Sequence, residues 1–147
     1  MMNRNPYLVT FTPTKELLGG DSWFMVVEYA AKYAVEFNYT IENDNCTGKF
    51  YGWFPTEDGE LSMNEDCCKS YSFSLNDTDW PTNLINAATE FLSEILWTEI
   101  NVLADVAIEQ GWSDDEFYQE ALNRGFVPDY FPDPSHAKSQ LRYYKLT

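Results

Sequence analysis

The side chains that could do chemistry in this sequence are mainly carboxylates, because other reactive groups are sparse. The chain has one histidine, His136, in the turn-rich segment Pro-Asp-Pro-Ser-His. The three cysteines, Cys46, Cys67 and Cys68, lack Cys-x-x-Cys spacing, and the adjacent pair is poorly placed to bridge itself. One histidine also cannot make a two-histidine metal motif. We therefore expect reduced thiols, no metal and no cofactor.

Loop motifs of common enzymes are missing as well. The sequence contains no GxxxxGK[ST] or GxGxxG phosphate loop, no GxSxG elbow and no DxDxDG calcium loop. Two carboxylates alone can cleave a glycoside, but nothing here singles out such a pair. We therefore predict no catalytic residues and a protein that is not an enzyme.

The acidic residues are concentrated in the middle of the chain. Between Phe50 and Asn123 there are 16 acids and one base, Lys69, so this part carries the whole formal charge of -15. Such a field repels the phosphates of nucleic acids and membranes, and it attracts basic protein surfaces. We therefore expect a basic partner protein, with no direct binding to nucleic acid or membrane.

Part of this charge forms a stripe on a predicted long helix. Asp79 before Pro81 marks its start, and helical periodicity runs from about Thr82 to Gln110, ahead of Gly111. Glu99 falls inside the apolar face, so we expect it to be half-buried with a raised pKa, or paired with Lys or Arg. The apolar face comprises Leu84, Ala88, Phe91, Leu92, Ile95, Val102, Leu103 and Val106. The stripe opposite comprises Glu90, Glu94, Asn101, Asp105 and Glu109, with Trp97 beside it.

The carboxylates of this stripe span roughly 28 Å along the helix and have no Lys or Arg four residues away. A row of this kind can imitate a phosphate backbone, although a solvated helix face is the alternative interpretation. Two other segments, Glu57 to Asp66 and Asp114 to Glu120, also carry only negative charges. The candidate partner-binding residues are therefore Glu90, Glu94, Trp97, Asp105 and Glu109, with Glu57, Asp58, Glu60, Asp114, Asp115 and Glu116.

The remaining patterns predict a β-meander for the helix to cover. Alternation of apolar and polar residues predicts a strand at Ala34 to Glu42, whereas Trp23 to Tyr33 fits a strand or a buried helix. A further strand is expected at Tyr7 to Thr12. Another is expected at Lys49 to Phe54, after a turn-rich segment from Asn43 to Gly48, and a third around Tyr71 to Leu75, after an acidic loop from Thr56 to Asp66. The segment from Gln140 to Leu146 could add an edge strand.

A capping box of Ser113 and Glu116 predicts a second helix, ending at about Asn123. The expected fold class is α+β: an antiparallel β-meander of three to five strands packed against one long helix and one short helix. We expect one domain, residues 1–147. Because there is neither an apolar run of about 18 residues nor a secretory signal, we also expect a cytoplasmic location.

In size, charge and acid-lined helices, the chain resembles phage-encoded DNA mimics: anti-restriction proteins, anti-CRISPR proteins and uracil-DNA glycosylase inhibitors. The resemblance implies an inhibitor whose carboxylates replace phosphates in the basic groove of a host nucleic-acid-binding protein, in the host cytoplasm. Trp97, Trp80 or Trp112 would then supply apolar anchors.

Two other functions fit the same composition. One is an immunity-type protein that neutralises a basic toxin through a local, shape-fitted patch. The other is a binder of a small signalling nucleotide, which needs a basic or aromatic pocket. The residues available for such a pocket are Arg124, Lys138, Arg142 and Lys145, near Tyr143 and Tyr144.

Overall fold

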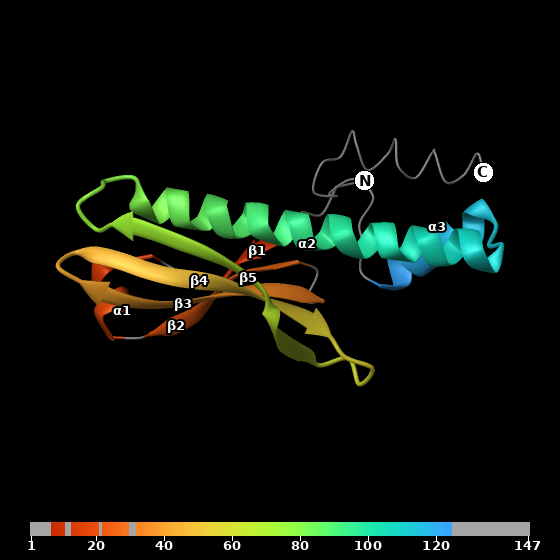
Figure 1. Cartoon of the computed structure of the whole chain (residues 1–147), viewed down its shortest axis with the longest axis horizontal. Helices are drawn as coiled ribbons and strands as arrows, with labels where there is room; N and C mark the ends of the chain where they lie inside the picture. Colours follow the sequence, from red (N-terminus) through yellow and green to blue (C-terminus); the bar gives the residue numbers. More distant parts are fainter. Residues whose placement is uncertain (1–6, 11–12, 21, 30–31, 125–147) are drawn as a thin grey trace. The chain divides into compact units, whose positions relative to one another are not determined.

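The computed structural model describes residues 7–10, 13–20, 22–29 and 32–124. Its sheet has five antiparallel strands in sequence order, so the meander is confirmed and the fold class is α+β (Figure 1). The elements are β1 (Tyr7–Val9), α1 (Lys15–Gly20), β2 (Trp23–Tyr29), β3 (Tyr33–Glu42), β4 (Asn45–Pro55), β5 (Leu61–Ser74), α2 (Trp80–Gln110) and α3 (Asp114–Asn123).

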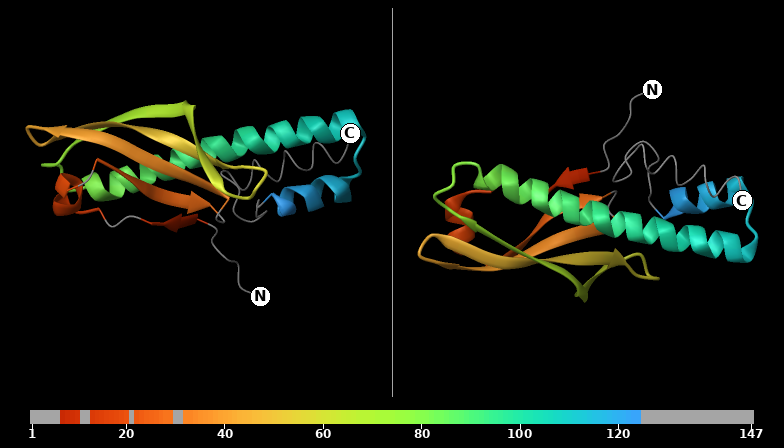
Figure 2. Two further views of the ribbon diagram at one scale, coloured as in Figure 1. Left: turned by 90° about the horizontal axis from the view of Figure 1, so that it is seen from below. Right: turned by 45° about the horizontal axis from the view of Figure 1, so that its top comes forward.

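The chain divides into two compact units. The first, which we call the sheet unit, runs from Tyr7 to Leu92 and holds the sheet, α1 and the start of α2. The second, the helical unit, contains the rest of α2 from Ser93 together with α3, which lies antiparallel beside it (Figures 1 and 2). The expected single domain stays a prediction. Among the described helices, none is long and apolar enough to cross a membrane.

The segment Trp23–Tyr29, which the sequence left open, is a strand that pairs with β3. The next hairpin turns more tightly than expected. Glu42 pairs with Asn45 across only Asn43 and Asp44, whose φ angles of 52° and 66° are left-handed. Asn and Asp tolerate this conformation, which two-residue hairpins need. The expected turn from Asn43 to Gly48 is therefore wrong, since most of it belongs to β4.

An aromatic layer joins the sheet to the first part of α2. The Phe50 and Phe91 rings lie 6.0 Å apart, and Phe73 stacks on Trp80 with the ring centroids 5.3 Å apart. Phe37 lies next to Phe50 in the same layer, at 5.2 Å. Because neighbouring strand residues alternate between the two faces, β4 directs Phe50 toward α2 and Tyr51 and Trp53 to the other side.

The buried face of α2 changes along the helix. The predicted residues Leu84, Phe91 and Ile95 are buried, but Val102 and Val106 are 52% and 37% exposed, so their placement was wrong. The second part of the helix instead buries Leu96, Ile100, Leu103, Ala104 and Ala107. On a helical wheel this face is rotated by roughly 130° from the first. The rotation occurs close to Ser93, where the division between the two units falls.

Local signals also missed one helix and misplaced one loop. The pair Gly19 and Gly20 ends α1, in which Leu18 is buried and its carbonyl accepts a hydrogen bond from the Tyr39 hydroxyl at 2.6 Å. The predicted loop from Thr56 to Asp66 is shorter, because β5 already begins at Leu61.

The predictions for the segments near the two ends of the chain have different outcomes. Helix α3 and its capping box are confirmed. The strand predicted at Tyr7 to Thr12 is described only as β1, Tyr7–Val9. The possible strand at Gln140 to Leu146 lies outside the described residues.

Candidate protein-binding site

The acidic positions of the predicted stripe are on the surface of α2. Glu90, Glu94, Asp105 and Glu109 are all exposed. The helix contains no Lys, Arg or His in its 31 residues, so no base of its own offsets them. Trp97 and Asn101 between them are partly buried, and the Asn101 Oδ1 atom is buried without a hydrogen-bond partner among the described residues. The stripe is therefore two exposed acidic stretches separated by a partly covered turn.

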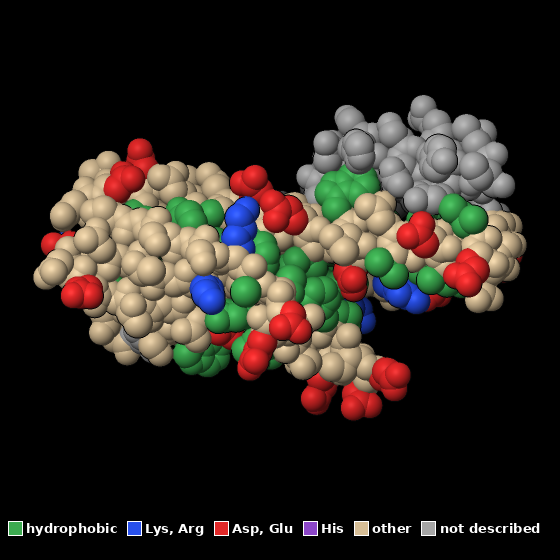
Figure 3. Space-filling view, in the orientation of Figure 1, with side chains coloured by type: hydrophobic (Ala, Val, Ile, Leu, Met, Phe, Trp, Pro, Cys, Tyr) green, Lys and Arg blue, Asp and Glu red, His purple; other side chains and the backbone are tan. Residues whose placement is uncertain are grey.

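The second predicted group of acids lies at the tip of the β4–β5 hairpin. Glu57, Asp58 and Glu60 are exposed in a turn closed by the Thr56 amide, which donates to the Glu60 carbonyl at 2.7 Å. Figure 3 shows red acidic side chains gathered at this tip and along the exposed side of α2. The tip points away from the first part of α2 in Figure 1, so the structure does not bring these acids together with Glu90.

The third group begins α3, and one of its members has a structural task. The Glu116 carboxylate accepts a hydrogen bond from the Ser113 amide at 3.1 Å, and the Ser113 hydroxyl accepts one from the Glu116 amide at 3.2 Å. Such a box satisfies amides at a helix start. Glu116 therefore helps to hold α3, which begins at Asp114.

The proposed tryptophan anchors differ in exposure. Trp80 is only 6% exposed and stacks on Phe73, so it is a core residue and the prediction of a surface anchor there was wrong. Trp97 and Trp112 are partly buried. An anchor must present surface to its partner. Trp97 and Trp112 therefore remain candidates, and Trp80 does not.

Of the two alternatives expected for Glu99, half-burial with a raised pKa is confirmed. It is half-buried in the helical unit, and this burial raises its pKa, while the nearby positive charge of Arg124 partly lowers it. Arg124 also donates from Nε to the Glu120 carboxylate at 3.1 Å. Arg124 therefore acts with two carboxylates of its own unit. The other residues considered for a nucleotide pocket lie outside the described part of the chain.

The cysteines differ in accessibility and do not gather into a metal site. Cys46 is buried, which raises the pKa of its thiol to about 11, whereas Cys67 is partly buried and Cys68 is exposed. Within the described ranges, no three His, Cys, Asp or Glu side chains are grouped to hold a metal ion. His136 lies outside these ranges.

The structure also reveals a cluster that sequence reasoning missed, on the sheet face opposite α2. Glu36, a polar residue of the alternating segment from Ala34 to Glu42, is only 5% exposed. Its carboxylate accepts hydrogen bonds from Trp53 Nε1 at 3.1 Å and from Asn38 Nδ2 at 3.3 Å. A signal was present in β4, where Tyr51 and Trp53 alternate with Phe50 and Phe54, so that both faces of the strand carry rings.

Comparisons with known proteins assign no family: no family model, no curated protein and no solved structure matches this chain.

Proposed function

We propose that this protein is an acidic inhibitor that occupies the nucleic-acid site of a basic, nucleic-acid-binding protein. The observation that supports this best is α2, whose exposed carboxylates Glu90, Glu94, Asp105 and Glu109 lie on a helix without a single base. Solvated helices commonly mix both signs, because opposite charges one turn apart stabilise the helix. A helix of one sign instead favours a partner of the opposite sign.

The mechanism is occupancy and needs no reaction. The carboxylates of the two exposed acidic stretches of α2 take positions that phosphates occupy in the partner's basic groove. Each exposed ion pair contributes about 0.2–1 kcal/mol, so affinity comes from many pairs together and falls as salt screens them. The same field speeds the encounter with a basic surface.

The first test measures inhibition directly. Proteins captured from a bacterial lysate are purified, and their binding to labelled duplex DNA is measured with and without this protein. We expect stoichiometric loss of DNA binding. Changing Glu90→Gln, Glu94→Gln, Asp105→Asn and Glu109→Gln together should weaken inhibition at least tenfold at low salt, whereas each single change should weaken it about two- to fivefold.

A matched control removes four exposed acids elsewhere: Glu16→Gln, Glu42→Gln, Asp44→Asn and Asp79→Asn. This variant has the same net charge as the stripe variant and should inhibit almost like the unchanged protein. Equal inhibition by the stripe variant and the unchanged protein contradicts the proposal. So does DNA binding by the free protein, or a captured partner that still binds DNA within the complex.

A further inference from the structure

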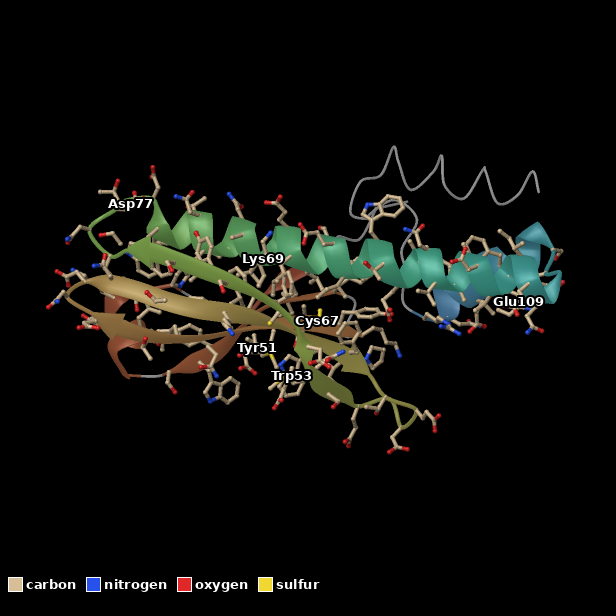
Figure 4. The ribbon with its side chains drawn as sticks, viewed as in Figure 1. Tyr51, Trp53, Cys67, Lys69, Asp77 and Glu109 are labelled. Carbon is tan, nitrogen blue, oxygen red and sulfur yellow. The ribbon has the colours of Figure 1, made fainter. Side chains whose placement is uncertain are left out.

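The sheet face opposite α2 carries an aromatic surface within the sheet unit. We call it the outer aromatic cluster, and define it by Trp23, Tyr51 and Trp53. Trp23 is 51% exposed, and the other two rings are partly exposed. The labelled Tyr51 and Trp53 lie on the side of the sheet away from α2 in Figure 4. Across the strands, Tyr51 pairs with Cys68 and Trp53 pairs with Met63, so apolar and thiol side chains of β5 border the rings.

A buried carboxylate lies beneath this cluster. Glu36 pairs with Tyr51 across the strands and accepts a hydrogen bond from the Trp53 indole, so both rings neighbour its charge. Both of its oxygens accept hydrogen bonds, from Trp53 and Asn38. An indole N–H that donates to a carboxylate is held in one orientation, and the charge adds to the negative potential of the ring face. That combination attracts a cation placed over the ring.

The hairpin that carries Tyr51 and Trp53 is mainly acidic, and its two lysines, Lys49 and Lys69, lie just outside its acidic part. From Phe50 to Cys68 the hairpin contains five acids and no base, and Glu57, Asp58, Glu60, Glu65 and Asp66 are all exposed. Glu65 and Asp66 belong to a bulge, because Gly52 pairs with Asn64 while Tyr51 already pairs with Cys68. The Asn64 side chain accepts from the Asp66 amide at 2.9 Å and supports this bulge. Bulges often re-aim side chains next to functional surfaces.

We propose that the outer aromatic cluster and the hairpin acids bind an arginine-rich segment of a basic partner. Guanidinium planes lie on the Tyr51 and Trp53 rings, and neighbouring guanidiniums pair with the hairpin carboxylates. Arginine fits better than lysine, because its planar group stacks on aromatic faces and also forms two-pronged pairs with carboxylates. This inference rests on the proposed function, to which it adds a second contact surface and the chemistry of its ligand.

The other occupants of an aromatic sheet face fit less well. Nucleic acid can stack its bases on such rings, but it then needs a basic groove for its backbone, whereas this hairpin is acidic. A second copy of the chain would bring its own acidic hairpin to the same face, and like charges would repel. The excess of five acids over two lysines between Asn45 and Ser74 therefore favours a cationic peptide.

The test compares a nona-arginine peptide with a nona-lysine peptide, with affinities taken from fluorescence anisotropy. We expect arginine to bind at least threefold more tightly, and Tyr51→Thr to weaken arginine binding about two- to fivefold. Glu36→Gln, which keeps an acceptor for the Trp53 indole, should reduce the preference for arginine. Urea midpoints of both variants establish that they are folded.

Charge variants then test whether peptide binding depends on the hairpin acids in particular or only on the net negative charge of the protein. Glu57→Gln with Asp58→Asn and Glu60→Gln should weaken binding about tenfold at low salt. The control, Glu42→Gln with Asp44→Asn and Asp79→Asn, makes the same charge change toward the opposite end of the sheet and should have little effect. Equal losses from the two triple variants contradict the proposal, as does equal affinity for the two peptides.

Cys68 supplies a local reporter, because its exposed thiol lies opposite Tyr51. Bound nona-arginine should slow alkylation of Cys68 by iodoacetamide, and Cys68→Ser identifies the modified site. Protection of Cys68 by self-association without peptide overturns the proposal in favour of a second copy. If the cluster variants bind normally while the α2 stripe variant loses DNA competition, this inference fails and the proposed function stands. If instead the cluster variants lose peptide binding while the α2 stripe variant still competes with DNA normally, the cluster is supported as a binding surface and occupancy by α2 is rejected.

Discussion

Glu99 is an acidic side chain whose surroundings oppose its charge. Half-burial raises its pKa above the ordinary value of 4.5, and Arg124 offsets only part of that effect. The folded chain therefore keeps the proton of Glu99 at pH values where the unfolded chain has lost it. By proton linkage, the contribution of this group to the free energy of unfolding falls as the pH rises through this range.

Replacing Glu99 with Gln should therefore stabilise the protein at neutral pH, because the ionised group in its half-buried position is gone. The gain should shrink as the pH falls toward 4.5 and disappear below it, where Glu99 is protonated in both states. Urea denaturation across this pH range measures the difference from the unchanged protein. Glu109→Gln, an exposed change on the same helix, is the control. A gain that is independent of pH, or a loss at pH 7, contradicts the assignment.

At the scale of elements, α2 is one helix with two buried faces. Its first part packs aromatic side chains on the sheet, and in its second part, which belongs to the helical unit, Leu96, Ile100 and Leu103 are buried. A single helical wheel assumes one partner along the whole length. That assumption placed Val102 and Val106 inside, where the structure exposes them.

Two alanine substitutions distinguish a helix with two buried faces from a helix with a single buried face. Leu96 is fully buried, so Leu96→Ala should lower the free energy of unfolding by about 2–5 kcal/mol. Val102 is 52% exposed, and Val102→Ala should change it by no more than about 0.5 kcal/mol. Urea denaturation measures both. Similar losses from the two variants would restore the single face expected from the periodicity.

Features that depend on neighbouring residues in the chain could be predicted from the sequence, whereas features that depend on contacts between distant segments could not. The exposed acids of α2 follow from helical periodicity, and the α3 start follows from a capping box formed by Ser113 and Glu116. Helix α1 could not be predicted in this way, because a contact from Tyr39, 21 residues away from Leu18, supports it. The burial of Glu36 likewise depends on the register of three strands, which places Met25 and Tyr51 on either side of it.

At the scale of the whole molecule, the formal charge of -15 destabilises the folded chain. Like charges held close in the folded chain repel one another, and unfolding separates them. The buried aromatic and aliphatic residues of both units must offset this repulsion. Mobile ions screen the repulsion, so ionic strength should alter stability.

Added potassium chloride should therefore raise the melting temperature between low and physiological ionic strength. The fourfold α2 variant, with four fewer negative charges, should start from a higher melting temperature and respond less to salt. Differential scanning calorimetry measures both quantities. A melting temperature that falls with added salt over this range would mean that attractive charge pairs outweigh repulsion in the folded chain.

Gly48 limits how this sequence can diverge over evolution. It lies on β4 between Tyr39 and Tyr71 of the neighbouring strands, and a Cβ atom there would come within 2.8 Å of Phe37 Cε1 and of Tyr39 Cβ while also meeting the Asn38 carbonyl oxygen. Every missense mutation of a glycine codon adds that atom. Descendant lineages can therefore replace Gly48 only if the β3 backbone at Asn38 and Tyr39 moves away from β4, a change that moving the Phe37 ring alone does not supply.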